Sequence, residues 1–166
     1  MIDDRHYVTT VESQFGKLTV VATDLGLRAL TWSGDSPTRV PLPDDLIDTA
    51  DHPILSAACL QLAEYLERER TQFDIQFDLR GTEFQRKTWE ALATIPYGDT
   101  ATYGEQAKRI GRPKAVRAVG SATGRNPISI ILPCHRVIGA SGDLVGFAGG
   151  IETKKELLAF ERSRVG

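Results

Sequence analysis

Cysteine is scarce in this 166-residue chain, and its few copies follow no metal-binding pattern. The two cysteines are Cys59 and Cys134, and the three histidines are scattered along the sequence. Two cysteines cannot build a disulfide framework, and the usual Cys/His spacing of a zinc site is missing. We therefore expect no metal, and a reducing compartment that keeps a reactive thiol free.

Long hydrophobic runs are also missing. No apolar stretch approaches the roughly 18 residues that a membrane span needs. Residues 1–5 lack the charged and apolar regions of a signal peptide. We therefore expect a cytoplasmic protein with no membrane partner. A hydrophobic content of 41% is enough for the buried core of one domain or of two small lobes.

Acidic and basic residues are distributed unequally between the two halves of the chain. Residues 1–80 carry 7 Lys/Arg and 14 Asp/Glu, a balance of −7, whereas residues 81–166 carry 13 and 8, a balance of +5. Residues 105–136 are more basic still, with 7 basic side chains and 1 acidic one. A basic second half indicates an anionic partner, although a solvated surface explains the charge equally well.

The first 80 residues are expected to form a small β-rich lobe, an antiparallel sheet with one helix. Alternating apolar residues predict strands over 6–12, 17–23, 27–32 and 73–79. Residues 33–53 are rich in Pro and Asp and are expected to form a loop. Apolar residues at helical spacing predict a helix over 54–68, with Cys59 on its buried stripe.

The second lobe, residues 81–166, is expected to be mainly helical, which makes the chain an α+β protein. Three capping-box patterns mark helix starts near residues 83, 103 and 154. A helix over 103–110, a short turn and a second helix over 114–124 match the layout of a helix-turn-helix.

The strongest chemical signal is the pair Cys134 and His135. It follows the apolar run 128–132, which is interpreted as a buried strand. The thiolate is the reactive form of cysteine, and an adjacent imidazole is one means of producing it. On an extended strand the two neighbours point to opposite faces, so a bridging water is expected between them. The pair predicts a covalent nucleophile, against the alternative that Cys134 only packs in the core.

The predicted helix 114–124 is built almost entirely from small residues. Arg117 is the one long polar side chain near its middle, and basic residues flank both ends. Helix-turn-helix proteins usually read bases through long polar side chains in the major groove. This helix instead predicts sequence-independent contact with DNA in the minor groove, with Arg117 as a probe. Tight packing between helices would also use small residues.

These features together resemble one family, the O6-alkylguanine-DNA alkyltransferases, over residues 80–161. The resemblance rests on Phe84-Gln85 with Trp89, Ile95-Pro96-Tyr97-Gly98, Thr102-Tyr103-Gly104, Arg117-Ala118-Val119-Gly120, Asn126-Pro127, Pro133-Cys134-His135-Arg136-Val137-Ile138-Gly139, Gly149-Gly150, and Leu157-Leu158 followed by Glu161. It implies a DNA repair methyltransferase that flips an alkylated guanine out of the duplex. The alkyl group then moves irreversibly to the protein's own cysteine, with no cofactor, so each molecule acts once.

The resemblance also implies roles for four catalytic residues. Cys134 corresponds to the alkyl acceptor, and His135 to the base that deprotonates it through a water. Glu161 corresponds to the carboxylate that orients the histidine. Asn126 corresponds to a hinge that links the recognition helix to the site.

Further residues correspond to the family's binding groups. Recognition of the flipped base is implied for Tyr103, Val137 and Ala148. Contact with DNA is implied for Arg117, Ala118, Ser121 and Arg125, with Arg117 filling the gap that the flipped guanine leaves. The expected partner is double-stranded DNA containing O6-alkylguanine, bound by a monomer, with clustering along the DNA left open.

Other classes of function remain open at this point. A damage-sensing protein without transfer activity would resemble this family but lack the acceptor cysteine, so Cys134 argues against it. A helix-turn-helix regulator would need a base-reading helix and a ligand domain, and the sequence indicates neither. A cysteine hydrolase is a weaker alternative still, because no oxyanion site is evident in the sequence.

Overall fold

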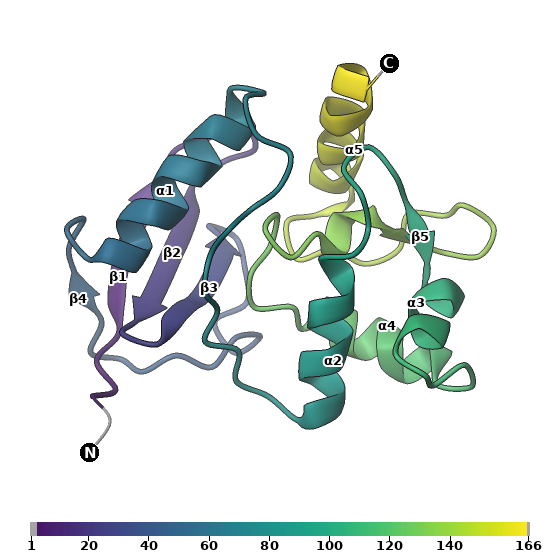
Figure 1. The fold of residues 1–166 in the computed structure, drawn as a ribbon, viewed down its shortest axis with the longest axis horizontal. Helices are drawn as coiled ribbons and strands as arrows, with labels where there is room; N and C mark the ends of the chain where they lie inside the picture. The colour runs from purple at the N-terminus through teal and green to yellow at the C-terminus, as the bar shows by residue number, and fades with distance from the viewer. Residues whose placement is uncertain (1–2, 166) are drawn as a thin grey trace. The chain divides into compact units, whose positions relative to one another are not determined.

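The computed structural model describes residues 3–165, so Met1 and Ile2 of the N-terminal segment considered above, and Gly166, lie outside it. The chain divides into two compact units, Met1–Arg80 and Gly81–Gly166 (Figure 1). A sheet with one helix forms the first unit, and the second is mainly helical, which confirms the predicted α+β class. No helix within residues 3–165 is long and apolar enough to cross a membrane.

The first unit is built on a sheet with the strand order β3-β2-β1-β4. The antiparallel meander predicted from alternation is present as β1 (Tyr7–Val11), β2 (Leu18–Thr23) and β3 (Gly26–Trp32). β4 (Ile47–Asp48) lies inside the segment predicted as a loop and pairs in parallel with β1. Two residues are too few for a periodic pattern, which explains why β4 was not predicted.

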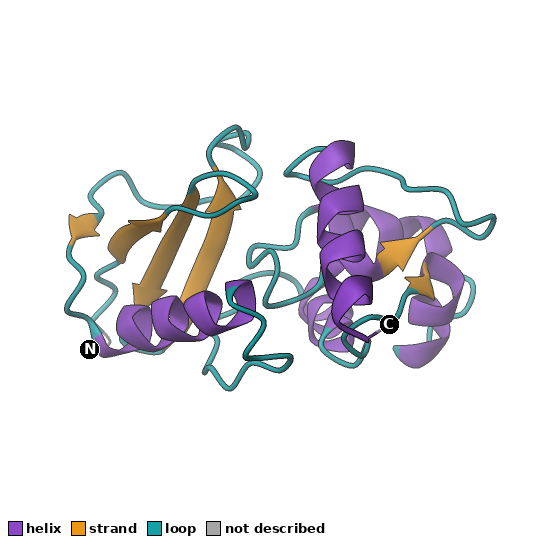
Figure 2. Cartoon of the chain, turned by 90° about the horizontal axis from the view of Figure 1, so that it is seen from above, coloured by secondary structure: helices purple, strands orange, loops and turns teal. Residues whose placement is uncertain are grey.

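Both faces of this sheet are covered, which explains why β2 and β3 are almost fully buried. One face is covered by α1 (Pro53–Leu66), as Figure 2 shows. This helix buries Leu55, Ala58, Leu62 and Tyr65. On the other face, Val21 and Ala29 pack with side chains from the segment before α1, namely Val40, Leu42 and Leu46. The sequence predicted Cys59 on the buried stripe of this helix, and this prediction is wrong, because Cys59 is only half-buried on α1.

Residues 73–79 do not form the predicted strand. They run along the edge of β3 and make one isolated bridge, between Leu27 and Phe77. The Leu27 N–H donates to the Gln76 carbonyl, and the Leu27 carbonyl accepts from the Asp78 N–H, both at 2.8 Å. Gly26 permits this approach, because a Cβ there would lie 2.5 Å from the Phe77 carbonyl carbon. The alternating apolar residues of this segment are only half-buried, and the strand that they predicted does not form.

The helices of the second unit begin largely where capping residues predicted. α2 (Glu83–Leu92) starts after Thr82, and α3 (Tyr103–Arg109) starts after Thr102. Both threonine side chains accept a hydrogen bond from the N–H three residues later. α5 (Ile151–Val165) begins earlier than residue 154, because Gly150 (φ +93°) turns the chain directly into the helix.

α3 packs against α4 (Val116–Gly124), with residues 110–115 connecting them, and α2 packs on α4 as well. α4 starts two residues later than predicted, because Ala115 has non-helical backbone angles. The Trp89 Nε1 on α2 donates to the Ala122 carbonyl at 2.8 Å and fixes α4 in place. This arrangement has the predicted order of helix, turn and helix, whose use in DNA binding stays a prediction.

A short parallel ladder joins β5 (Ala101–Thr102) to β6 (Val137–Ile138). It places the start of α3 next to the segment that contains Cys134. The run 128–132, predicted as a strand, is buried but forms turns, with Ile130 in the left-handed region at φ +70°. Cys134 therefore lies not at the end of a strand but on a 3-10 helix, η1 (Cys134–Arg136).

Candidate active site

Cys134 is the first residue of η1 and is 8% exposed, so its thiol lies just beneath the surface. Its N–H donates to the Leu132 carbonyl at 2.8 Å, which tightens the turn before the helix. Successive residues of a 3-10 helix are about 120° apart around its axis, whereas strand neighbours are opposed. The expectation that Cys134 and His135 point to opposite faces of a strand is therefore wrong.

His135, Arg136 and Glu161 form a buried network between η1 and α5. The His135 Nε2 lies 2.8 Å from the Glu161 Oε2, and both side chains are fully buried. Arg136 donates from Nε to Oε1 at 2.8 Å and from Nη2 to Oε2 at 2.9 Å. Its Nη1 donates to the Ile95 carbonyl at 2.7 Å, which ties the network to the turn after α2. The structure thus brings Glu161 together with His135, as predicted.

Burial sets the protonation states in this network. It lowers the pKa of His135, and the charge of Glu161 offsets this only in part. Burial also raises the pKa of Glu161, but the hydrogen bonds that His135 and Arg136 donate and the charge of Arg136 outweigh that effect and hold the pKa well below its usual range. We therefore take His135 as neutral and Arg136 as the permanent cation that keeps Glu161 ionised.

The hydrogen bond to Glu161 decides which nitrogen of His135 carries the proton. An ionised carboxylate only accepts, so Nε2 must be the donor and Nδ1 keeps its lone pair. Nδ1 is buried and has no hydrogen-bond partner among the described residues. The arrangement therefore leaves a neutral imidazole nitrogen able to accept a proton, one residue after the thiol.

Tyr103 directly follows β5, and the pairing of β5 with β6 brings this part of the chain next to the segment that contains Cys134. It is the first residue of α3 and lies beside Gly120 of α4, where a Cβ would be 3.8 Å from the Tyr103 ring. Burial raises the pKa of the phenol, and the charge of Cys134 adds to this effect. The hydroxyl therefore stays protonated and can donate a hydrogen bond near the sulfur.

Val137 and Ala148 occupy different segments after Cys134. Val137 is fully buried in β6, and its N–H donates to the Cys134 carbonyl. Ala148 is half-buried in the loop of residues 139–150, which leads to α5. The structure thus places Val137 directly after η1, the turn that carries Cys134, whereas the contact predicted for Ala148 depends on the course of this loop.

Sequence reasoning missed Lys154, which is fully buried on α5. Its Nζ donates to the Val137 carbonyl at 2.7 Å and to the Val145 carbonyl at 3.0 Å. Burial lowers the pKa of the amine, and the charge of Cys134 opposes that effect. One signal could have found it, because Lys154 falls on the helical stripe of Leu157, Leu158 and Glu161 that faces the site.

The four residues predicted to contact DNA lie on one open face of α4 and its C-terminal end. Arg117, Ala118, Ser121 and Arg125 are all exposed, whereas Val119, Ala122 and Thr123 face the interior. Ala115 provides no side-chain cap, so the first N–H groups of α4 have no side-chain acceptor there. Open N–H groups at a helix start are a favourable environment for phosphate.

Asn126 holds the segment between α4 and Cys134. Its side chain is fully buried, donating from Nδ2 to the Leu132 carbonyl at 2.7 Å and accepting from the Ile128 N–H at 3.0 Å. These bonds bend the run 128–132 into turns, which explains why an apolar sequence is not a strand here. The position agrees with a residue that links α4 to η1.

We expect Asn126→Ala to lower the free energy of unfolding by about 3 kcal/mol, because it leaves a buried N–H without its acceptor. Urea unfolding followed by circular dichroism measures the loss. A change below about 0.5 kcal/mol, which is typical of an unconstrained surface position, would contradict the bracing role.

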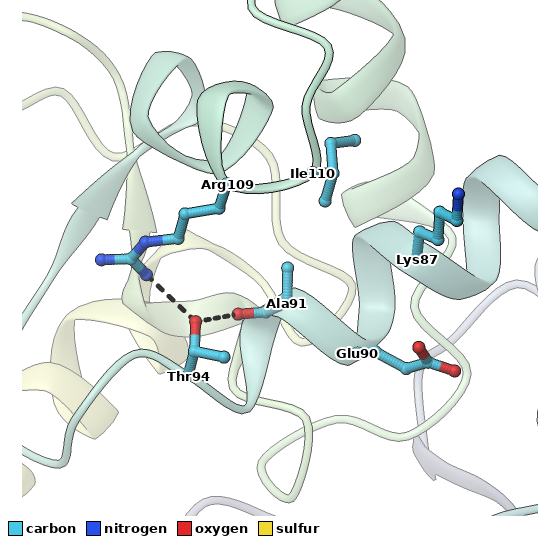
Figure 3. Close-up of a pocket in the computed structure, with 6 residues that line it drawn as sticks. All are labelled: Lys87, Glu90, Ala91, Thr94, Arg109 and Ile110. Atoms are coloured by element: carbon cyan, nitrogen blue, oxygen red, sulfur yellow. Dashed lines mark hydrogen bonds between the residues drawn. The ribbon is translucent and has the colours of Figure 1, made fainter.

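A cavity of about 760 Å³ lies on α2 and the end of α3 (Figure 3). It is lined by Lys87, Glu90, Ala91, Thr94, Arg109 and Ile110. The Arg109 Nη1 donates to the Thr94 hydroxyl at 3.3 Å, and that hydroxyl donates to the Ala91 carbonyl at 2.6 Å. Dashed lines mark both bonds in Figure 3. None of the predicted site residues lines this cavity, so its size does not make it the site of the chemistry.

Comparison with known proteins assigns both units to one family. Residues 6–79 match the 6-O-methylguanine DNA methyltransferase, ribonuclease-like domain. Residues 83–163 match the 6-O-methylguanine DNA methyltransferase, DNA binding domain. The chain belongs to the 6-O-methylguanine DNA methyltransferase family, which confirms the resemblance found in the sequence.

Individual relatives extend over nearly the whole chain. The methylated-DNA–protein-cysteine methyltransferase of Mycobacterium tuberculosis is 49% identical over 164 residues, covering 96% of this chain and 93% of the relative. The protein of the same name from Methanosarcina acetivorans is 43% identical over 157 residues, covering 95% and 99%. A crystal structure of Mycobacterium tuberculosis OGT in complex with DNA matches with a TM-score of 0.86 at 46% identity, covering 95% and 94%.

Proposed function

We propose that this protein repairs DNA by moving an alkyl group from the O6 atom of guanine to the sulfur of Cys134. One observation carries the assignment to this residue: the thiol precedes a buried histidine whose Nε2 is held by Glu161 and whose Nδ1 has no hydrogen-bond partner among the described residues. The relatives named methylated-DNA–protein-cysteine methyltransferase support the substrate class.

The transfer is a direct displacement at the alkyl carbon. His135 takes the thiol proton at Nδ1 through a water, and Glu161 stabilises the imidazolium that forms, as in a catalytic triad. The thiolate sulfur then bonds to the alkyl carbon as the bond from that carbon to O6 breaks, and the electron pair stays with the guanine. Tyr103 donates a hydrogen bond to the departing base. The product is a thioether, which has no easy return to thiol, so each molecule acts once.

DNA carrying a radiolabelled methyl group on guanine O6 tests this proposal. We expect the label to move to the protein, at no more than one per molecule, and to be recovered on the peptide that contains Cys134. Label that stays on the DNA, or product that accumulates beyond one equivalent, would overturn it.

The partner that we propose is double-stranded DNA bound through its minor groove by the open face of α4. Small side chains there permit a close approach to the backbone, and no row of long polar side chains is present to read bases. The target guanine must leave the stack to reach a thiol beneath the surface. We further propose a monomer that acts in the cytoplasm, where a free thiol persists.

Arg117→Ala is expected to slow repair of methylated duplex DNA about 10- to 100-fold, because opening the base stack costs a few kcal/mol that an inserted side chain offsets. The reaction with free O6-benzylguanine should change less than about twofold, since no stack is opened. Single-turnover rates on the two substrates give the comparison.

Arg125→Ala is the matched control, because it removes the same charge from the other end of α4. It should weaken DNA binding, but with duplex at saturating concentration it should repair methylated DNA at close to the parent rate. Equal losses on duplex and free base for Arg117→Ala would rule out the flipping role.

A further inference from the structure

Lys154 is a buried cation that the reaction described above does not use. Its side chain is fully buried on α5, and burial lowers the pKa of the amine. A lysine is almost never fully buried unless a partner compensates the charge. Two backbone carbonyls accept from its Nζ, those of Val137 and Val145. Carbonyls satisfy the donors but carry no negative charge.

The charged groups around Cys134 suggest which anion compensates Lys154. Tyr103 on α3 is a neutral phenol whose pKa is raised by burial and by the charge of Cys134, and His135 on η1 is neutral. Glu161 on α5 is already engaged by His135 and Arg136. No carboxylate forms an ion pair with Lys154 in the part of the chain that the structure describes. The Lys154 Nζ donates to the carbonyl of Val137, whose own N–H donates to the Cys134 carbonyl, so the ammonium lies one residue from the turn that carries the thiol. The charge of Cys134 raises the pKa of this amine against the effect of burial, which leaves the sulfur as the group whose ionisation the lysine favours.

The two carbonyls that Lys154 holds lie at opposite ends of one stretch of backbone. Val137 belongs to β6, immediately after η1, whereas Val145 lies in the loop of residues 139–150. One ammonium group therefore ties the reactive turn to the loop that carries Ala148. Its loss would release the loop from β6.

We propose that Lys154 is a positioning residue for alkyl transfer, which clamps the loop of residues 139–150 to the reactive turn and supplies a buried positive charge that favours the Cys134 thiolate. The inference rests on the proposed function, because that function makes Cys134 the acceptor. It predicts two separate losses when the lysine is replaced, one in thiol reactivity and one in loop order.

Thiol reactivity is tested by the rate of alkylation with iodoacetamide as a function of pH, in a Cys59→Ser background so that Cys134 is the reacting thiol. Lys154→Met should shift the midpoint of this profile upward by about one unit and lower the rate at pH 7 about tenfold. Lys154→Arg, which keeps the charge, should stay within about threefold of the parent. A Lys154→Met midpoint equal to that of the parent would overturn the role of the charge.

Lys155→Met is the matched control, because this neighbour is exposed and pairs only with Glu152, at 3.4 Å, among the described contacts of its side chain. It should leave the profile unchanged. Amide hydrogen exchange over residues 138–150 tests the clamp, and it should accelerate at least about tenfold in Lys154→Met and not in Lys155→Met. Equal exchange in both variants would overturn the clamp.

The Lys154→Arg variant and a parallel transfer assay separate misfolding and failure of the proposed function from failure of this inference. If Lys154→Met lacks a cooperative urea transition, Lys154→Arg decides the question, and an ordinary cysteine profile in a folded Lys154→Arg protein would overturn the role of the charge. Transfer from methylated DNA is measured in parallel on the parent protein. A parent that fails to take up label refutes the proposed function, whereas a parent that takes it up, with Lys154→Met at the same rate, refutes only the inference.

Discussion

Protein carrying Cys134→Ser is expected to bind DNA as the natural chain does and to take up no alkyl group from it. A serine hydroxyl at this position stays protonated at neutral pH, so no strong nucleophile faces the alkyl carbon. The rate should fall on the order of 10⁶-fold, the scale found when a covalent nucleophile is removed from an enzyme. Transfer of labelled methyl and a DNA mobility shift measure the two properties on the same preparation.

Cys59→Ser is the control for this result. Cys59 is half-buried on α1, and burial raises the pKa of its thiol, which keeps it protonated and unreactive. Transfer should therefore proceed at the parent rate. Label retained by Cys134→Ser but lost in Cys59→Ser would move the acceptor to the first unit and refute the assignment.

Glu161→Gln is expected to cost about 3–5 kcal/mol of unfolding free energy, because it removes the only charge that compensates a buried arginine among the described contacts of Arg136. Transfer should slow as well, since the amide leaves the imidazolium of His135 unsupported. Urea unfolding and single-turnover transfer give the two values. Glu152→Gln makes the same substitution at an exposed site of α5 and should change stability by less than about 0.5 kcal/mol.

The same network predicts how stability depends on pH. The pKa of Glu161 is lowered by folding, so its contribution is complete above about pH 4.3 and is lost as the pH falls further. The pKa of His135 is also lowered, so the unfolded chain binds a proton below about pH 6.5 that the folded chain resists. Both effects weaken the fold in acid. Glu161→Gln should therefore show a shallower decline below pH 4.3, and an unchanged slope there would contradict the network.

Much of the fold followed from local sequence signals. The meander of β1 to β3 was predicted because apolar residues alternate along these segments, and α2 and α3 because Thr82 and Thr102 are strong caps. Segments whose backbone partners are distant were not predicted. β5 and β6 are two residues each, and only their pairing defines them. The run 128–132 has the composition of a buried strand, but the Asn126 side chain folds it into turns.

Some residues of the candidate site could likewise be predicted from the sequence, and others could not. The adjacent pair Cys134 and His135 can be recognised in sequence, and the resemblance to a known family added Glu161. The structure brings these three into one region, while their roles in transfer stay predictions. Arg136 and Lys154 went unrecognised, because basic side chains are normally exposed and nothing local marks a buried one. Their burial depends on carbonyls at Ile95, Val137 and Val145 that only the tertiary fold supplies.

The edge of the first sheet has a consequence for how this chain can be divided. β4 covers β1 on one side, and the segment through Phe77 covers β3 on the other, through the backbone of Leu27. Uncovered strand edges pair with other chains and promote aggregation. A fragment that ends before residue 73 would expose the N–H and carbonyl of Leu27 to another copy of itself, whereas one that ends at Arg80 keeps this edge shielded. Residues 73–79 form no strand of their own, but by covering the edge of β3 they protect the first unit from self-association.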